Sequence, residues 1–240
     1  MNFKAALFDL GSTLIEYENH SWETLGKMGI MSAYPYLKKQ FPHLPEVNEF
    51  GPTFYEYLRD ILDSRSDYSE VELHDTCIKI FRRMELNIDN EIVEKFVDVY
   101  YKPVTDQITM IPGADDILAK LKSAGLVIGL VSNSIFPEKF HLGEMERFGL
   151  LKYFDFTIFS SSMGIRKPGK KIFEMALKKA EVDAAEAVFI GDRFDADIAG
   201  AANAGIVSVW RYREGRENPD GIEPDHSIMN LNELEIIVLK

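Results

Sequence analysis

Cysteine is almost absent from this chain: a single residue, Cys77, allows neither an intramolecular disulfide nor a cluster of thiolate metal ligands. Cys77 lies beside Ile78 and Ile80 in an amphipathic stretch, and a free cysteine in such a setting usually packs in the hydrophobic core. The five histidines have none of the short spacings typical of zinc sites. We therefore expect a buried Cys77, histidines that lie at the surface, and no zinc.

Positive charge and long apolar runs are also scarce. The 27 basic residues face 39 acidic ones, and the net charge of −12 would repel nucleic acid unless a basic face were segregated, which the sequence does not show. No apolar run approaches the roughly 20 residues that cross a bilayer, and Lys4 interrupts an N-terminus without a secretory hydrophobic region. We expect a cytoplasmic protein that binds neither nucleic acid nor a membrane.

What the chain does contain is a repeated pattern of short apolar segments that end at polar or turn-forming residues. Hydrophobic residues make up 46% of the 240 residues, enough for one large α/β domain or for a core domain with a smaller insert. The apolar segments are residues 3–9, 127–131, 156–159 and 187–190. Helical patterns separate them, at 115–123, 170–180 and 197–204. This alternation predicts an α/β fold with a Rossmann-like, doubly wound parallel sheet.

Residues from about 17 to 105 have a different pattern. They are dense in aromatic residues, and their apolar positions follow helical spacing without the alternation typical of a strand. Pro103 and the turn at 111–113 mark the end of this segment. The sequence therefore predicts a core domain formed by residues 1–16 and 106–240, and an inserted all-α cap domain formed by residues 17–105.

Polar residues follow the predicted strands in an order that resembles a known family. Ligands bind at the carboxyl ends of the strands in such sheets, so these residues are expected to converge there. The four segments are Phe8-Asp9-Leu10-Gly11-Ser12-Thr13-Leu14, Leu130-Val131-Ser132-Asn133, Arg166-Lys167-Pro168 and Gly191-Asp192-Arg193-Phe194-Asp195-Ala196-Asp197. In order and context they resemble the four motifs of the haloacid dehalogenase superfamily of hydrolases, in the form with an α-helical cap of the C1 type. The resemblance covers both ends of the chain, and the insert matches in position and helical character.

The resemblance implies a catalytic role for three residues. Asp9 would be the nucleophile that forms an aspartyl-phosphate intermediate, Lys167 would neutralise both the carboxylate and the phosphate, and Ser132 would donate its hydroxyl to a phosphate oxygen. A phosphoryl group is a polyanion, so its transfer needs such cations and donors around it. The further residues expected to bind the substrate are Leu10, Thr13, Asn133 and Arg166.

The resemblance also implies a Mg²⁺ site. Its ligands would be Asp9, the backbone carbonyl of Gly11, Asp192 and Asp197, because a hard cation prefers oxygen ligands. A helix cap is the alternative for the acidic cluster, since carboxylates often lie near a helix N-terminus. Metal binding is favoured over capping for Asp192 and, less strongly, for Asp197, whereas a cap or surface position is favoured for Asp195.

One position departs from the family pattern. Gly11 stands where most phosphatases of this family have a second aspartate, which protonates the leaving alcohol and then deprotonates the attacking water. General acid–base help is typically worth about 10² to 10⁴ in rate. Its loss favours substrates whose leaving group needs no proton, such as an acyl phosphate, a nucleoside diphosphate or an aryl phosphate. Glu16, Glu18, His20 or a residue of the insert are candidates for a replacement.

These features predict a Mg²⁺-dependent phosphohydrolase or phosphotransferase that acts on a small phosphorylated metabolite. Two alternatives remain open: a binding or scaffolding protein that has kept the fold without turnover, and a 2-haloacid dehalogenase, which also lacks the second aspartate and needs no metal. Residues 164–171 nearly match a phosphate-binding P-loop, but Lys171 replaces the hydroxyl residue that would hold Mg²⁺, and Pro168 removes a backbone N–H. The oligomeric state stays open.

Overall fold

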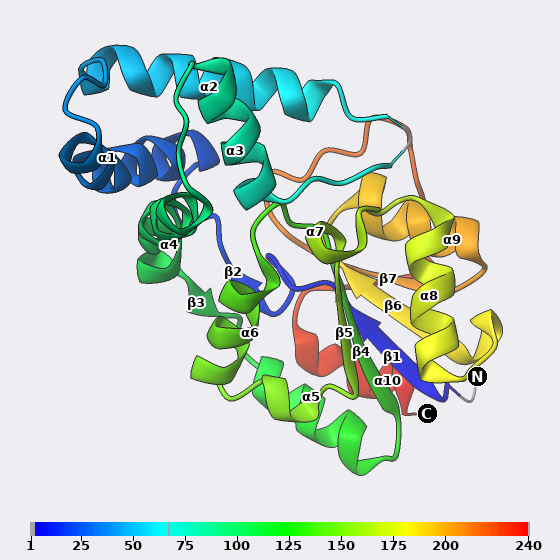
Figure 1. Ribbon diagram of the computed structural model, residues 1–240. Helices are drawn as coiled ribbons and strands as arrows, with labels where there is room; N and C mark the ends of the chain where they lie inside the picture. The colour runs from blue at the N-terminus through cyan, green and yellow to red at the C-terminus, as the bar shows by residue number, and fades with distance from the viewer. Residues whose placement is uncertain (1–2, 67, 240) are drawn as a thin grey trace.

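The fold is built around a six-stranded parallel sheet. The structure, a computed structural model, describes residues 3–66 and 68–239. The strand order is β5-β4-β1-β6-β7-β8, so β1 lies near the middle and the chain winds outward from it in both directions (Figure 1). The strands are β1 Ala5–Phe8, β4 Val127–Ser132, β5 Phe156–Phe159, β6 Ala187–Gly191, β7 Val207–Arg211 and β8 His226–Ile228.

Helices cover both faces of this sheet (Figure 1). All four residues of β1 are buried, and successive side chains point to opposite faces. Ala5 and Leu7 pack with residues of α8 and α9, whereas Ala6 and Phe8 belong to the core on the other face. The helices of this part are α5 Ala114–Ser123, α6 Glu138–Arg147, α7 Ser160–Met163, α8 Lys170–Ala180, α9 Ala199–Ala204 and α10 Leu234–Val238. The α/β fold with a doubly wound sheet is therefore confirmed.

Between β1 and β4 the chain forms a second group of helices. They are α1 Trp22–Gln40, α2 Val47–Asp63, α3 Leu73–Arg83 and α4 Asn90–Gln107. Their shared core is aromatic: the ring of Phe54 lies 5.7 to 6.1 Å, centroid to centroid, from those of Phe81, Phe96 and Tyr100. Cys77 is buried in the same core, as expected from its neighbours.

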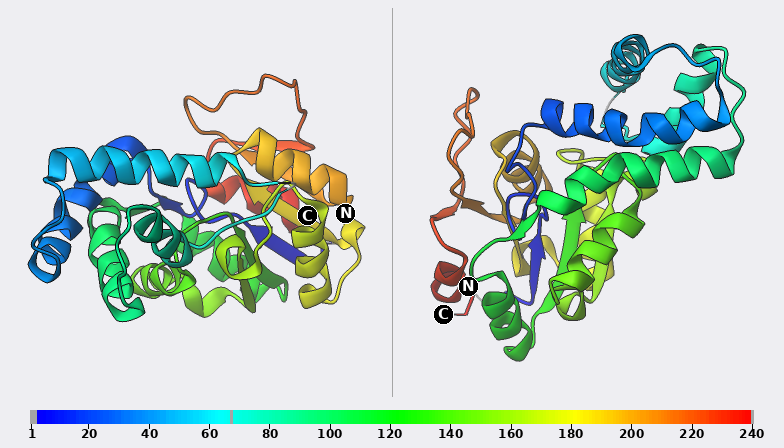
Figure 2. Two further views of the ribbon diagram at one scale, coloured as in Figure 1. Left: turned by 45° about the horizontal axis from the view of Figure 1, so that its top comes forward. Right: turned by 90° about the vertical axis from the view of Figure 1, so that its left-hand side faces the viewer.

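A two-stranded antiparallel ribbon lies where the chain leaves and re-enters the sheet region. Its strands are β2 Ile15–Glu16 and β3 Thr109–Met110. The helices α1–α4 extend from this ribbon across the carboxyl edge of the sheet (Figure 2). We propose that these helices form the cap domain of residues 17–105 and that residues 1–16 and 106–240 form the core domain.

The loop between α2 and α3 makes a further contact with the sheet region. The backbone N–H of Glu70 donates to the carbonyl of Gly164 at 2.9 Å, and the N–H of Arg166 donates to the carbonyl of Tyr68 at 2.8 Å. This loop therefore packs directly against the segment that carries Lys167.

One histidine contradicts the expectation that histidines lie at the surface. His141 of α6 is 5% exposed and packs against three aromatic rings, those of Tyr17, Tyr101 and Phe159. The sequence around His141 did not reveal this position, because its aromatic contacts come from residues distant along the chain. The expectation of a surface histidine is wrong here.

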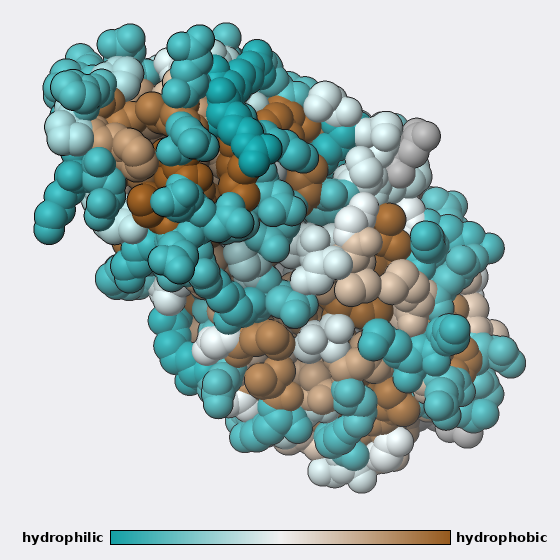
Figure 3. All heavy atoms as spheres, viewed as in Figure 1, coloured by the Kyte–Doolittle hydropathy of each residue, from teal (hydrophilic) through white to brown (hydrophobic). Residues whose placement is uncertain are grey.

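The outer surface of the helical segment carries apolar side chains among polar ones (Figure 3). Trp22, Met28 and Met31 of α1 are exposed. Within residues 3–66 and 68–239, no helix combines the length and the apolar character that crossing a bilayer requires.

Candidate active site

Asp9 directly follows β1 at the carboxyl edge of the sheet and is buried. Its backbone N–H donates to the carbonyl of Ile190 in β6 at 2.9 Å, which fixes the end of the strand. The Lys167 ammonium donates to Oδ1 of the Asp9 carboxylate at 2.7 Å, and the Thr13 hydroxyl donates to Oδ2 at 3.4 Å. The structure thus brings the predicted nucleophile together with two of its predicted partners.

Lys167 is held from several sides and is only 2% exposed. Its ammonium also donates to the carbonyl of Val131 at 2.7 Å and lies 2.8 Å from Oδ1 of Asp197. The Asn133 side chain makes two hydrogen bonds to the Lys167 backbone. Its Oδ1 accepts from the Lys167 N–H at 2.8 Å, and its Nδ2 donates to the Lys167 carbonyl at 2.9 Å. In this arrangement the side chain of Asn133, expected to bind the substrate, positions the lysine.

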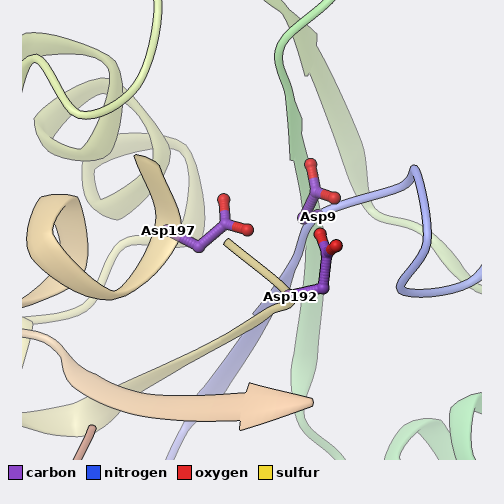
Figure 4. Close-up of side chains that lie close together, drawn as sticks. All are labelled: Asp9, Asp192 and Asp197. Atoms are coloured by element: carbon purple, nitrogen blue, oxygen red, sulfur yellow. The ribbon is translucent and has the colours of Figure 1, made fainter. Parts of the chain in front are cut away.

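Three buried carboxylates meet beside this lysine. One oxygen from each of Asp9, Asp192 and Asp197 lies within 4.8 Å of the others (Figure 4). Asp192 directly follows β6, the neighbour of β1, and Asp197 approaches from the helical segment after it. Oxygen donors at this spacing suit a hard divalent cation, so the donor set fits the metal that the family resemblance implies.

The charges of the cluster shift one another's pKa values. Burial raises the pKa of Asp9 to about 6, and the nearby Asp197 carboxylate adds to the rise while Lys167 opposes it. Burial likewise raises the pKa of Asp192 to about 7, together with Asp197 and Asp9, against the effect of Arg216. Burial lowers the pKa of Lys167, but the Asp197 and Asp9 carboxylates raise it by more. Negative charge is therefore in excess around the lysine, a situation that a divalent cation would relieve.

Asp197 is not the N-cap residue of a helix. Its Oδ2 accepts at 3.0 Å from the N–H of Arg193, the residue that precedes the helical segment Phe194–Ile198, so the carboxylate satisfies a backbone donor at the start of that segment as well as facing Lys167. The helix expected to start at Asp197 starts earlier, as a short π-helical segment at Phe194–Ile198 that α9 continues. Gly191 leaves the required space, because a Cβ there would overlap the Asp197 carboxylate. Asp195 is exposed and pairs with Arg193 at 2.6 Å, as a surface residue would.

The sequence-based prediction missed an arginine that contacts the cluster. Arg216, in the segment between β7 and β8, forms an ion pair with Oδ2 of Asp192, and its Nη2 lies 3.0 Å from Oε1 of Glu18. Arg213 of the same segment pairs with Glu18 at 3.0 Å and with Glu16 at 3.3 Å. Both glutamates, candidates for the missing acid and base, are thus neutralised by arginines. No spacing in the sequence marks this segment as functional.

The turn after Asp9 has room for a Cβ at position 11. Gly11 does not have a positive φ, and a Cβ at this position would lie 3.6 Å from Cδ2 of Tyr17, an ordinary contact. The positive φ of the turn, 54°, falls on Ser12 instead. The backbone of Leu10 hydrogen-bonds to the Asp9 carboxylate and opposes the rise of its pKa. A Cβ at position 11 therefore meets no overlap and needs no unusual backbone conformation.

The two remaining predicted residues lie at the same edge of the sheet. Ser132 is the buried last residue of β4, which pairs with β1 in a register that places Phe8 beside Leu130, so Ser132 lies one residue beyond the level of Asp9. Arg166 lies directly before Lys167 and is half-buried. Within the described part of the chain, no hydrogen bond joins the Arg166 side chain to the carboxylate cluster, and its Nε is buried without a partner.

The motifs behind this geometry match a defined family. The haloacid dehalogenase-like hydrolase family matches residues 3–205, which span every residue of the carboxylate cluster and Lys167. The chain belongs to this family. The resemblance seen in the sequence is therefore confirmed over most of the chain.

Relatives and a solved structure extend this result. The chain is 33% identical, over 61% of its own length and 64% of the relative's, to the pyrimidine 5'-nucleotidase of Escherichia coli, so it spans less than two thirds of that protein. It is 27% identical, over 98% of both chains, to the ribulose-1,5-bisphosphate 5-phosphatase of Halopiger xanaduensis. The solved 2-haloacid dehalogenase of Pseudomonas syringae matches 98% of this chain and 97% of its own, with 23% identity and a TM-score of 0.73. At that identity, the likeness shows the fold alone.

Proposed function

We propose that the protein is a Mg²⁺-dependent phosphohydrolase or phosphotransferase that acts on a small phosphorylated metabolite through an aspartyl-phosphate at Asp9. The observation that carries the proposal is the buried contact between Asp9 and Lys167 inside a cluster of three carboxylates. Two relatives are named for activity on a nucleotide and on a sugar bisphosphate, which supports the substrate class.

The carboxylate of Asp9 would attack the phosphorus. With a pKa of about 6 the Asp9 carboxyl is mostly ionised at neutral pH, and the Lys167 ammonium, 2.7 Å from Oδ1, stabilises the ionised form. A bond forms between an Asp9 oxygen and phosphorus while the bond to the leaving oxygen breaks, and water then hydrolyses the acyl phosphate. Lys167 and Ser132 would stabilise the phosphoryl oxygens during both steps, since charge is redistributed over them.

The residues that would hold the metal are those of the acidic cluster. We propose Asp9, the backbone carbonyl of Gly11, Asp192 and Asp197 as its ligands. A bound Mg²⁺ would neutralise phosphoryl oxygens as charge develops on them. The raised pKa values of Asp9 and Asp192, which burial and then the neighbouring carboxylates cause, support this assignment.

Substrates with good leaving groups are the preferred class. Gly11 provides no carboxylate, and the two nearby glutamates are paired with arginines. A leaving group that departs without a proton avoids the loss of about 10² to 10⁴ in rate that missing acid–base help causes. We therefore expect acetyl phosphate and aryl phosphates to react faster than sugar phosphates.

The experiment measures phosphate release from acetyl phosphate, an aryl phosphate and a sugar phosphate, with and without Mg²⁺. Asp9→Asn serves as the blank, and Asp195→Asn, an exposed carboxylate outside the cluster, as the matched control. We expect Mg²⁺-dependent release that falls at least about 10³-fold in Asp9→Asn and persists in Asp195→Asn. Release that survives in Asp9→Asn would contradict the proposal.

Two other results would identify the alternatives. A dehalogenase would release halide from a 2-haloacid without any metal, because its aspartate attacks carbon. A scaffolding protein would release neither phosphate nor halide. The acidic cluster beside Asp9 favours phosphate chemistry over both, since neither alternative needs three buried carboxylates around one lysine.

A further inference from the structure

The loop between α2 and α3 is tied to the segment that carries Lys167. We call residues 68–72 of this loop the insert loop and residues 164–169 the lysine loop. Ser69 and Ile165 form an antiparallel bridge, flanked by the two backbone hydrogen bonds that join these loops. The insert loop passes beside α7 (Figure 1). The helical insert therefore holds the lysine loop from outside the sheet.

Glu70 adds a buried carboxylate to this contact. Its side chain is only 3% exposed, and its Oε1 lies 2.6 Å from Nη1 of Arg65, just after α2. Its Oε2 accepts from the hydroxyl of Ser160, the first residue of α7, at 3.0 Å. A buried carboxylate is stable only where partners satisfy its oxygens, so Glu70 fixes the positions of Arg65 and Ser160.

Ser160 connects Glu70 to the loop that follows β4. Its Oγ accepts from the backbone N–H of Ser134 at 2.9 Å and donates its proton to Glu70. The residue before Ser134 is Asn133, whose side chain makes the two hydrogen bonds to the Lys167 backbone. Two hydrogen bonds therefore lead from Glu70 to the neighbour of the residue that positions the lysine.

These contacts close a ring that includes the lysine loop. The ring runs from the insert loop to the lysine loop, then through the Asn133 side chain to the loop after β4, and back through Ser160 to Glu70. Leu73, the first residue of α3, adds a backbone hydrogen bond of 2.6 Å to the carbonyl of Ile135 in the loop after β4. Both loops that position the lysine are therefore joined to the insert.

The ion pairs between α4 and α6 are of a different kind. Lys139 of α6 lies 2.9 Å from carboxylate oxygens of both Glu94 and Asp98 of α4, and the three side chains are 37 to 62% exposed. Exposed ion pairs contribute little to stability. They also lie outside the ring around the lysine loop. Glu70, rather than these pairs, is therefore the contact through which the insert can hold the lysine.

We infer that Glu70 is a positioning residue for Lys167, and that the insert loop, when packed on the core, holds this lysine in place beside Asp9. The effect on rate rests on the proposed phosphoryl transfer, whereas the effect on structure does not. Lys167 has to lie where it neutralises both the carboxylate and the phosphate, and a small displacement of such a group weakens its action. The position of the insert is thereby coupled to the catalytic lysine.

The first test measures backbone hydrogen exchange in Glu70→Ala. The truncation leaves the Ser160 hydroxyl and the Arg65 guanidinium without their buried partner. We expect about tenfold faster exchange in residues 164–169 and 133–136, and less than about a twofold change in β6, which serves as the internal reference. Faster exchange confined to the insert loop would overturn the inference, because the lysine loop would then be held without it.

Ser160→Ala tests the path from Glu70 to the loop after β4. It keeps the pair of Arg65 with Glu70 and the backbone bridge between the insert and lysine loops, but removes the acceptor of the Ser134 N–H. We expect about tenfold faster exchange in residues 133–136 and about a threefold increase in the lysine loop, whose contact with the insert loop stays. Unchanged exchange in residues 133–136 would contradict the path through Ser160.

The second test measures formation of the aspartyl-phosphate from acetyl phosphate in single turnovers with Mg²⁺. In Glu70→Ala we expect the maximal rate to fall about tenfold, and the acetyl phosphate concentration for half-maximal rate to change by less than about twofold, because the lysine acts most on the charge that develops during transfer. An unchanged maximal rate with a raised half-saturation would show that the insert loop acts on binding alone, which would overturn the positioning role.

Glu94→Ala is the matched control. It removes a contact between the insert and the core that lies outside the ring. We expect lysine-loop exchange and the maximal rate to stay within about twofold of the unaltered protein, since the pair is exposed. Effects as large as those of Glu70→Ala would show that Glu70 has no special role. If the unaltered protein forms no aspartyl-phosphate, the proposed function fails while the exchange data still test the coupling; if it does and Glu70→Ala changes neither exchange nor rate, the inference alone fails.

Discussion

The two sides of the site are built differently. On the sheet side, Asp9 and Asp192 directly follow two paired parallel strands, so backbone pairing fixes their positions, and Asn133 fixes the backbone of the buried Lys167. Burial makes the charges of all three costly. On the side that faces α1–α4, Arg216 and Glu18 are half-buried and are held by ion pairs between segments far apart in the sequence. The sheet side is therefore fixed by the fold, whereas the facing side depends on ion pairs between distant segments.

Removing the central cation tests the rigidity of the sheet side and should have the largest effect. Lys167→Met leaves Asp9 and Asp197 buried with an uncompensated charge, so we expect the free energy of unfolding to fall by about 3 to 5 kcal/mol. Chemical denaturation at neutral pH measures it. Lys171→Met, at an exposed lysine of α8, should change it by less than about 0.5 kcal/mol. Comparable values for the two variants would mean that the cluster does not depend on Lys167.

The dependence of stability on pH gives the next effect. The pKa of Asp192 is about 7 in the folded protein, above its ordinary value of 3.8, so the folded state binds the proton more tightly than the unfolded state. Its contribution to stability is therefore lost as the pH rises from about 4 to 7. Asn cannot ionise, so Asp192→Asn should gain stability relative to the unaltered protein through this window, on the order of 2 kcal/mol at pH 8 without divalent cations.

Asp195→Asn provides the control of opposite sign. Arg193 holds the pKa of Asp195 below its ordinary value, so this carboxylate stabilises the fold above that value and the substitution should not stabilise the protein at any pH. Denaturant unfolding of both variants at pH 4.5, 6 and 8 makes the comparison. If the gain in free energy of unfolding of Asp192→Asn over the unaltered protein does not grow with pH, ionised Asp192 destabilises the fold less than its burial indicates.

The sheet side could be predicted from the sequence because each of its residues is adjacent to a local pattern. Asp9 follows an apolar strand, Ser132 ends another, and Asp192 follows a third, so strand order alone brings them together. The helical character of the insert was also readable from its apolar spacing. The fold class and the family followed from these local features, and the structure and the family match confirm both.

The facing side could not be predicted, because tertiary contacts define it. His141 bonds to Tyr17, 124 residues away, and approaches Tyr101, 40 residues away, and no local pattern marks these contacts. Arg216 reaches Asp192 from a segment without regular structure. The packing of α4 and α6 against Tyr17, which follows β2, makes Tyr17, Tyr101 and His141 neighbours. Sequence patterns predict strands and helices, but they do not predict which side chains of different elements come into contact.

The smallest expected effect concerns the exchange of cations at Asp192. Arg216 pairs with the carboxylate that we assign to Mg²⁺, so the guanidinium and the metal compete for it. Arg216→Gln should therefore bind Mg²⁺ about three- to tenfold more tightly. The indole of Trp210 donates to the backbone carbonyl of Asp192 at 2.9 Å, so its fluorescence, read in a Trp22→Phe background, reports binding. Arg213→Gln is the control, because it removes the same charge from the same segment, but Arg213 pairs with Glu16 and Glu18 rather than with Asp192. An equal gain in Mg²⁺ affinity in Arg213→Gln would show that net charge, rather than competition at Asp192, sets the affinity.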